Sequence, residues 1–87
     1  MKKGTSRGKK KQVKSEQTEL EQLGTRIREL RKARGYTSQE TFAYDHDFNR
    51  VQYNKYERGG DVRFSTLIRI LKALDINLKD FFKEGFD

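Results

Sequence analysis

The sequence contains no cysteine, a single histidine and no long apolar run, and each of these shortages excludes a class of protein. Without cysteine, neither a disulfide framework nor a thiolate metal site forms, and His46 by itself does not make a zinc site. No stretch approaches the roughly 20 apolar residues that span a membrane, and no apolar segment follows the N-terminal lysines as in a signal peptide. We expect a soluble, cytoplasmic protein with no membrane contact, no metal, no cofactor and no small-molecule ligand.

Acidic residues are absent from the first 14 positions. These positions hold seven lysines and arginines, whereas residues 15–87 hold 13 basic and 13 acidic side chains, so the net charge of +7 belongs to the N-terminal segment alone. Residues 1–17 also lack apolar periodicity and contain Gly4 and Gly8, so we expect a flexible basic arm. Such an arm either contacts DNA phosphates or serves only as a solubilising tail, and the sequence favours neither.

Apolar residues recur at three- and four-residue steps from about residue 18 onward, which predicts helices. No strand pattern occurs, and a chain of 87 residues with 32% hydrophobic residues holds one small domain. We therefore expect an all-α, compact five-helix domain over residues 18–87. Its first helix is expected to start at a capping box of Thr18 and Glu21 and to end at Gly35; a start near Val13 is the alternative.

A second, short helix is expected over about residues 38–46, followed by a tight turn. Thr37 and Glu40 form the capping box that would begin this helix. Asp47 tolerates left-handed backbone geometry better than most residues, so it suits the turn. The sequence therefore predicts two short helices set at an angle to each other.

The third expected helix has a polar face suited to DNA bases. Asn49 caps it, Phe48 and Tyr53 occupy the positions of a hydrophobic staple, and Gly59 ends it. The side opposite the tyrosine carries Arg50, Val51, Asn54, Lys55 and Arg58. Arg and Lys hydrogen-bond guanine, Asn hydrogen-bonds adenine, and a small apolar side chain touches the thymine methyl. A solvated helix carries similar residues, so the rest of the pattern has to decide.

The C-terminal third is expected to hold the main packing element. A fourth helix over about residues 64–74 presents a wide apolar face, and Asn77 caps a last short helix. Phe81, Phe82 and Phe86 follow, and a short helix does not easily bury three rings. These rings either complete the core or form a surface for self-association.

From about Leu20 to Phe82 the chain resembles the helix-turn-helix domains of the lambda repressor and Cro type, the XRE-like family. The segments that carry the resemblance are Gln39 to Ala43, Asp47 to Asn49, Arg50 to Tyr53, and Tyr56 to Gly59. The resemblance implies a helix-turn-helix unit at about residues 38–58, whose second helix lies in the major groove of double-stranded DNA.

The resemblance also implies a role for each matching residue. The positions that contact bases are matched by Arg50, Val51, Asn54 and Lys55. The positions that contact phosphates are matched by Ser38, Gln39 and Arg58. A structural pair that bridges the first and third helices is matched by Arg31 and Glu57. Phosphate contacts set the register on DNA, and base contacts set the sequence.

Two features depart from the family pattern. Asp47 stands where glycine is common, and the link over residues 35–37 is one residue longer than in the commonest members. The charge of Asp47 near the turn weakens the expectation of phosphate contacts from the second helix. His46 matches a half-buried position, and no nucleophile and base are placed to act together, so we expect no enzyme.

We expect a small transcriptional regulator, a repressor acting by occupancy, that binds DNA as a homodimer because single domains of this type bury a limited interface. The chain leaves no room for a separate effector domain. Two alternatives use the same fold: the antitoxin of a toxin–antitoxin pair, and a bridging factor that binds a partner protein rather than bases.

Overall fold

The computed structural model describes the backbone of residues 9–86 and the side chains of residues 18–86. Five helices and no strand occur among the described residues, so the predicted all-α fold is confirmed. The helices are α1 (Lys9–Ala33), α2 (Gln39–Asp45), α3 (Arg50–Glu57), α4 (Phe64–Ala73) and α5 (Leu78–Phe81). None of these described helices is both long enough and apolar enough to cross a membrane.

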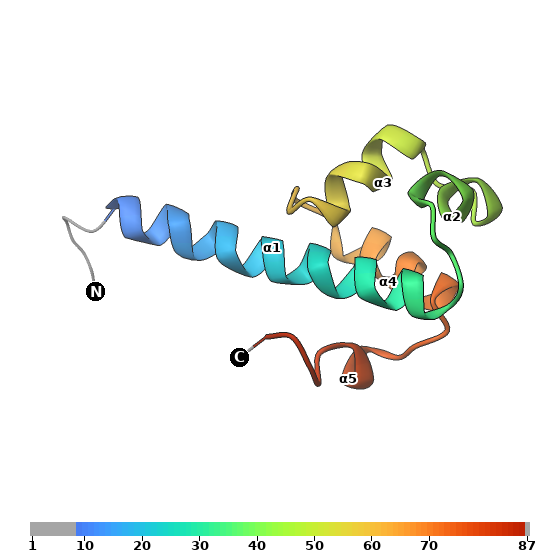
Figure 1. Cartoon of the computed structure of the whole chain (residues 1–87). Coiled ribbons are helices and arrows are strands. Elements are labelled where there is room, and N and C mark those ends of the chain that lie inside the picture. The colour runs from blue at the N-terminus through green and yellow to red at the C-terminus, as the bar shows by residue number, and fades with distance from the viewer. Residues whose placement is uncertain (1–8, 87) are drawn as a thin grey trace.

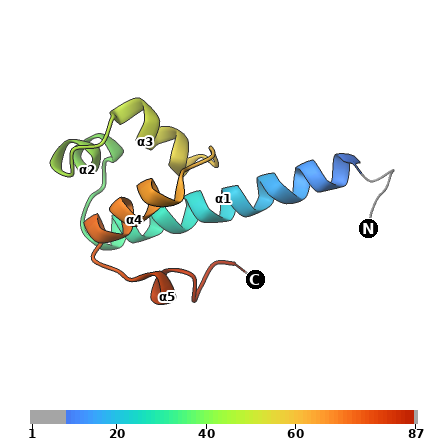
Figure 2. The same cartoon turned by 180° about the vertical axis from the view of Figure 1, so that it is seen from behind.

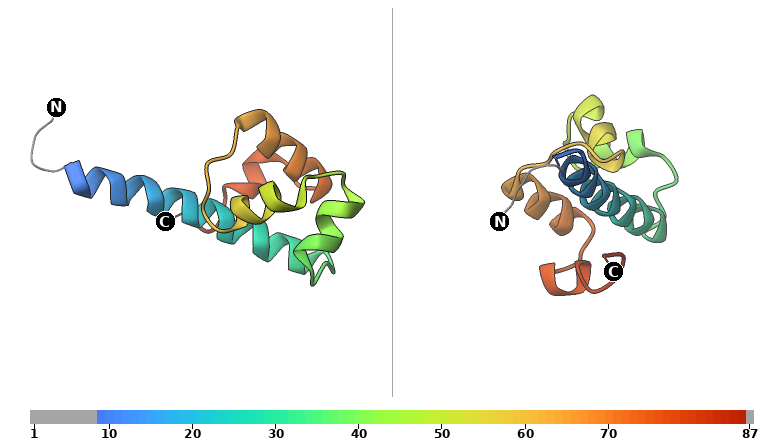
Figure 3. Two further views of the ribbon diagram at one scale, coloured as in Figure 1. Left: turned by 90° about the horizontal axis from the view of Figure 1, so that it is seen from above. Right: turned by 90° about the vertical axis from the view of Figure 1, so that its left-hand side faces the viewer.

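The long helix α1 is the axis of the molecule (Figure 1). Its C-terminal half is surrounded by the other elements: α2 and α3 lie on one side, α5 lies on the opposite side, and α4 packs alongside (Figures 2 and 3). Its N-terminal half projects beyond the rest of the chain (Figure 1). The helix-turn-helix unit therefore packs against the C-terminal half of α1.

The start of α1 differs from the prediction. The helix begins at Lys9, so Thr18 lies inside it and is not its N-cap, and the alternative start near Val13 is closer. Residues 9–17 are mostly Lys, Gln and Glu, which favour helix intrinsically but carry no apolar stripe to reveal it. Of the flexible arm predicted over residues 1–17, residues 9–17 are part of α1, whereas residues 1–8 lie outside the described part, where the arm remains a prediction.

Most of the predicted helix ends are confirmed. Gly35 follows α1 with a φ of 94°, a conformation that costs other residues more than glycine. Asp47 makes the turn with a φ of 64°. Asn49 Oδ1 accepts the Gln52 amide at 2.9 Å and so caps α3. The α2 cap was predicted wrongly: it is Ser38, whose Oγ accepts the amides of the second and third helical residues. Thr37 and Ser38 are both residue types that cap helices, so the sequence alone does not decide between them.

The hydrophobic core contains residues from every helix. The largest fully buried side chains are Tyr53, Phe42, Phe81, Ile27, Ile70 and Leu74. Phe48 and Tyr53 pack against each other as the predicted staple, with ring centroids 5.8 Å apart and ring planes tilted by 33°. Phe81 belongs to this core, whereas Phe82 and Phe86 pack against it from outside. The predicted inward face of α4 is too wide, since Phe64 is 62% exposed.

Arg26 of α1 and Arg34, which directly follows α1, bind the C-terminal ends of other helices. Arg34 Nε donates to the Leu74 carbonyl at 2.6 Å, where α4 ends. Arg26 Nε donates to the Phe81 carbonyl at 2.8 Å, where α5 ends. The last carbonyls of a helix lack internal partners and carry the negative end of its dipole, so a guanidinium is a suitable partner.

Candidate nucleic-acid interface

One side of α3 is fixed in the core. Tyr53 is fully buried, and Glu57 is 3% exposed. The main chain of this helix approaches α1 at Gly24, where a Cβ would lie 2.5 Å from the Glu57 carbonyl oxygen. The orientation of α3 about its own axis is therefore set, and the residues on its opposite side face outward.

The outward side of α3 holds the four residues that the sequence assigns to DNA bases. Val51 is 59% exposed, Arg50 and Lys55 are exposed, and Asn54 is half-buried. Together with Arg58 and Glu40 they line a shallow hollow of about 270 Å³ between α2 and α3. The exposed valine offers apolar contact to a base edge, and the cations around it offer hydrogen-bond donors.

The three residues assigned to phosphates are less closely grouped. Arg58 is exposed at the C-cap of α3 and lines the same hollow. Ser38 lies at the start of α2, where its Oγ accepts the amides of Glu40 and Thr41 at 3.1 and 3.3 Å. Gln39 is half-buried, and its side chain is engaged within the protein. Arg58 thus lies with the four outward residues of α3 around the hollow, whereas Ser38 and Gln39 do not line it.

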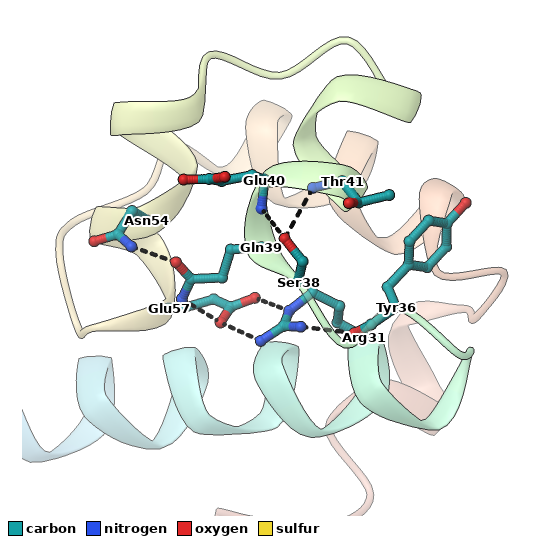
Figure 4. Close-up of polar contacts among 8 residues, drawn as sticks. All are labelled: Arg31, Tyr36, Ser38, Gln39, Glu40, Thr41, Asn54 and Glu57. Atoms are coloured by element: carbon teal, nitrogen blue, oxygen red, sulfur yellow. Dashed lines mark hydrogen bonds and ion pairs between the residues drawn. The ribbon is translucent and has the colours of Figure 1, made fainter.

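Arg31 and Glu57, the residues assigned to a structural pair, form a buried ion pair between α1 and α3 (Figure 4). Arg31 Nε lies 2.7 Å from Glu57 Oε2, and Arg31 Nη2 lies 3.2 Å from Glu57 Oε1. Arg31 also donates to the Tyr36 carbonyl at 2.7 Å. Its hydrogen bond to Glu57 raises the pKa of Arg31, even though burial opposes this. Arg31 therefore keeps its charge, and the pair ties α3 and the α1–α2 loop to α1.

Sequence reasoning did not find two contacts of Gln39 and one of Glu40. Gln39 Nε2 donates to Glu57 Oε1 at 2.8 Å, and Gln39 Oε1 accepts from Asn54 Nδ2. Glu40 Oε2 lies 3.5 Å from Arg50 Nη1, and both side chains are largely exposed. These contacts join residues 10 to 18 positions apart on different helices, so no local sequence pattern predicts them.

The turn between α2 and α3 is supported from α4. The Arg69 guanidinium lies 4.6 Å from the Phe48 ring centroid, and Arg69 Nη2 donates to the Asp47 carbonyl at 3.3 Å. A cation over an aromatic face is attracted by the ring quadrupole. The turn that sets the angle between the two helices is thereby held at Asp47 and Phe48.

His46 has the surroundings of a packing residue. Its ring lies 4.6 Å from the Phe42 ring and 5.6 Å from the Tyr36 ring, centroid to centroid. No group of three or more metal-binding side chains occurs among the residues that the structure describes. These surroundings agree with the structural role that the sequence assigns to this histidine.

The geometry and the comparisons with known proteins agree. A helix–turn–helix with an outward cationic helix is the architecture of a DNA-binding regulator, and residues 27–81 match the Helix-turn-helix family model. The chain belongs to this family, in its lambda repressor and Cro (XRE-like) branch, and is a sequence-specific DNA-binding transcription regulator rather than an enzyme.

Among solved structures the chain is similar to the restriction-modification controller protein C.AhdI from Aeromonas hydrophila. The two are 38% identical, with a TM-score of 0.65, over 72% of this chain and 96% of that chain. None of the curated proteins matches the chain.

Proposed function

We propose that α3 enters the major groove of double-stranded DNA and contacts bases through Arg50, Val51, Asn54 and Lys55. The observation that carries this proposal is the outward face of α3, where these side chains line one hollow while Tyr53 and Glu57 fix the opposite side in the core. A helix held rigidly by its inner face presents its outer side chains in a defined register, as base recognition requires.

Phosphate contacts are proposed for Ser38, Gln39 and Arg58, which flank this face. Arg58 ends α3 and is free to approach the backbone of the duplex, because it is exposed. The Ser38 hydroxyl accepts two amides and retains its own hydrogen for donation to a phosphate oxygen. Such contacts contribute affinity that falls steeply with salt and is similar for all sequences.

We also propose that the protein binds DNA as a homodimer through the groove between α1, α4 and the C-terminal segment. Exposed Phe64 and Phe82 line this groove with Leu20, Val62 and Phe86. A second copy is the favoured occupant, because one α3 reads only a half-site and two half-sites lie about 34 Å apart on DNA. In sedimentation, Phe64→Ser and Phe82→Ser should each shift dimer to monomer; wild type sedimenting as a monomer at high concentration would remove the proposal.

Its biological role is proposed to be repression by occupancy of an operator. The similarity to a restriction-modification controller protein supports a more specific proposal, that the regulated genes belong to a restriction-modification system. Genes for a methyltransferase and an endonuclease beside this gene, with an operator upstream, are the expected finding. An adjacent toxin gene would instead support an antitoxin.

Selection of bound fragments from random DNA, followed by binding titrations, tests the proposed base contacts. One enriched motif is expected, and Arg50→Ala should weaken binding to it by roughly 1–3 kcal/mol while leaving random duplexes unaffected. Arg58→Ala should weaken both equally. If no motif is enriched, or if Arg50→Ala and Lys55→Ala bind both duplexes like wild type, base recognition by α3 is wrong and a bridging factor is favoured.

A further inference from the structure

The polar side chains between α1 and α3 form one continuous series of hydrogen bonds, which we name the relay (Figure 4). Its members in order are Arg31, Glu57, Gln39 and Asn54. Arg31 and Glu57 are each 3% exposed, whereas Asn54 borders the hollow on the outer side of α3. The relay therefore runs from the core to the surface proposed to meet DNA.

The direction of the relay is fixed at its buried end. Glu57 is bound to the Arg31 guanidinium by two hydrogen bonds, and a carboxylate only accepts. Gln39 must therefore turn its Nε2 toward Glu57, where the distance to Oε1 is 2.8 Å. Its Oε1, an acceptor, is left facing Asn54, so Asn54 must present Nδ2.

This order decides which way the Asn54 amide faces. One N–H of Asn54 Nδ2 is held by Gln39, and Oδ1 is directed away from Gln39 (Figure 4). The amide retains Oδ1 and its second N–H for another partner. Adenine is complementary to this pair in the major groove, because its N6 amino group donates and its N7 accepts.

We propose that Gln39 is a positioning residue that presets the Asn54 amide to recognise adenine. This inference rests on the proposed function, and it assigns the Gln39 side chain to orientation of a base contact in addition to any phosphate contact. Guanine offers acceptors at both O6 and N7, so the preset Asn54 Oδ1 opposes its O6. The relay thus favours adenine over guanine at one base pair.

A reversed amide is disfavoured by the buried end of the relay. Turning Asn54 by half a rotation brings its Oδ1 against Gln39 Oε1, and two acceptors do not bond. Turning Gln39 as well moves the same conflict to Glu57, where a buried carboxylate would face an oxygen. With Nδ2 toward Gln39, each contact within the relay pairs a donor with an acceptor.

The experiment uses the full chain and the duplex motif selected from random DNA, with each base pair replaced in turn. Asn54→Ala identifies the base pair that Asn54 contacts, through loss of the A-over-G preference there. Gln39→Leu keeps much of the side-chain volume and removes both hydrogen bonds, and it should lower the same preference by about fivefold or more, the weak end of a bidentate base contact. Gln52→Ala, an exposed amide outside the relay, is the matched control and should keep that preference.

A second measurement needs no DNA. In NMR spectra of the free protein, the Asn54 side-chain amide should carry one hydrogen-bonded proton, and Gln39→Leu should shift that resonance toward a solvated amide while Gln52→Ala leaves it in place. The dispersion of the backbone amide resonances in the same spectra shows whether Gln39→Leu is folded.

The outcomes separate this inference from the proposed function. Loss of the preference and of the shifted resonance in Gln39→Leu supports the relay. If Asn54→Ala loses the preference but folded Gln39→Leu keeps it, the relay is wrong and base recognition by Asn54 stands. If Asn54→Ala changes no preference while Arg50→Ala does, the inference fails although α3 still binds bases.

Discussion

Gly24 of α1 lies directly against the main chain of Glu57 in α3. A Cβ placed on Gly24 would lie 2.5 Å from the Glu57 carbonyl oxygen and 2.6 Å from the Tyr56 carbonyl oxygen. Atoms do not approach so closely without contact strain, and both neighbours here are main-chain atoms that do not rotate aside. The absent side chain is what lets α3 sit on α1.

Gly24→Ala should destabilise the protein despite replacing a glycine inside a helix. Alanine favours helix over glycine by roughly 1 kcal/mol, but overpacking a tight contact costs about 1–3 kcal/mol and here requires α3 to move. We expect a lower midpoint in urea and weaker DNA binding. Arg28→Ala, an exposed site on the same helix, is the control and should change the midpoint little. A Gly24→Ala variant more stable than wild type would contradict this packing.

Local signals in the sequence predicted more of the fold than of the site. Asp47 and Gly35 act through their own backbone geometry and Asn49 through a bond to an amide three residues on, so these local roles were predicted correctly. The exposure of Phe64 depends on which helices reach α4, and an apolar pattern alone does not contain that information.

The contacts within the site could not be predicted from the sequence, because they join residues that only the fold brings together. Gln39 and Asn54 are 15 residues apart and meet only because the turn folds α2 against α3. A polar residue at each position was predicted to face DNA, but the contact between them was not. The cationic face could be read from helical spacing, whereas the interactions that orient its side chains could not.

Tyr53 should make the folded state sensitive to alkaline pH. Burial, with a contribution from nearby Glu57, raises the pKa of Tyr53 above its ordinary value of 10.0. Above about pH 10 the unfolded chain loses this proton while the folded chain keeps it, so unfolding releases a proton and stability falls as pH rises. Tyr53→Phe should flatten this decline in urea titrations from about pH 8 to 11, a range that brackets an ordinary tyrosine pKa. Tyr44→Phe, an exposed control, should decline like wild type.

Arg34 should stabilise the end of α4. Its Nε donates to the Leu74 carbonyl at 2.6 Å, and a hydrogen bond to a charged donor contributes about 1.5–3 kcal/mol. Arg34→Ala should lower the free energy of unfolding by an amount near the lower end of this range, because the guanidinium is partly solvated. Lys32→Ala removes an exposed positive charge from the same turn and is the control. Equal losses in the two variants would show that charge, not the hydrogen bond, is responsible.

Removing one partner of the buried ion pair should lower the free energy of unfolding more than removing both partners. Glu57→Leu leaves the Arg31 guanidinium buried without its carboxylate, which costs about 3–5 kcal/mol. Arg31→Met combined with Glu57→Leu removes both charges and should regain part of this loss. The Tyr36 carbonyl loses the Arg31 bond in the double variant, so full recovery is not expected. Calorimetry of the single and double variants measures the coupling, and strictly additive losses would rule the pair out as a unit.

Glu40 should oppose DNA binding while it contributes little to stability. Its carboxylate lies 3.5 Å from Arg50 at the edge of the hollow, and an exposed pair of this kind contributes about 0–1 kcal/mol. Near DNA the same carboxylate repels phosphates and competes with the bases for the Arg50 guanidinium. Glu40→Gln should therefore leave thermal unfolding almost unchanged and raise the affinity for DNA, with most of the gain at low salt because the added attraction is electrostatic.

Glu29→Gln, the control, removes the same charge from an exposed position on α1 away from the hollow and should give a smaller gain. Equal gains would assign the effect to net charge, whereas weaker binding by Glu40→Gln would mean that Glu40 itself contacts the operator, as a carboxylate does when it accepts from cytosine N4.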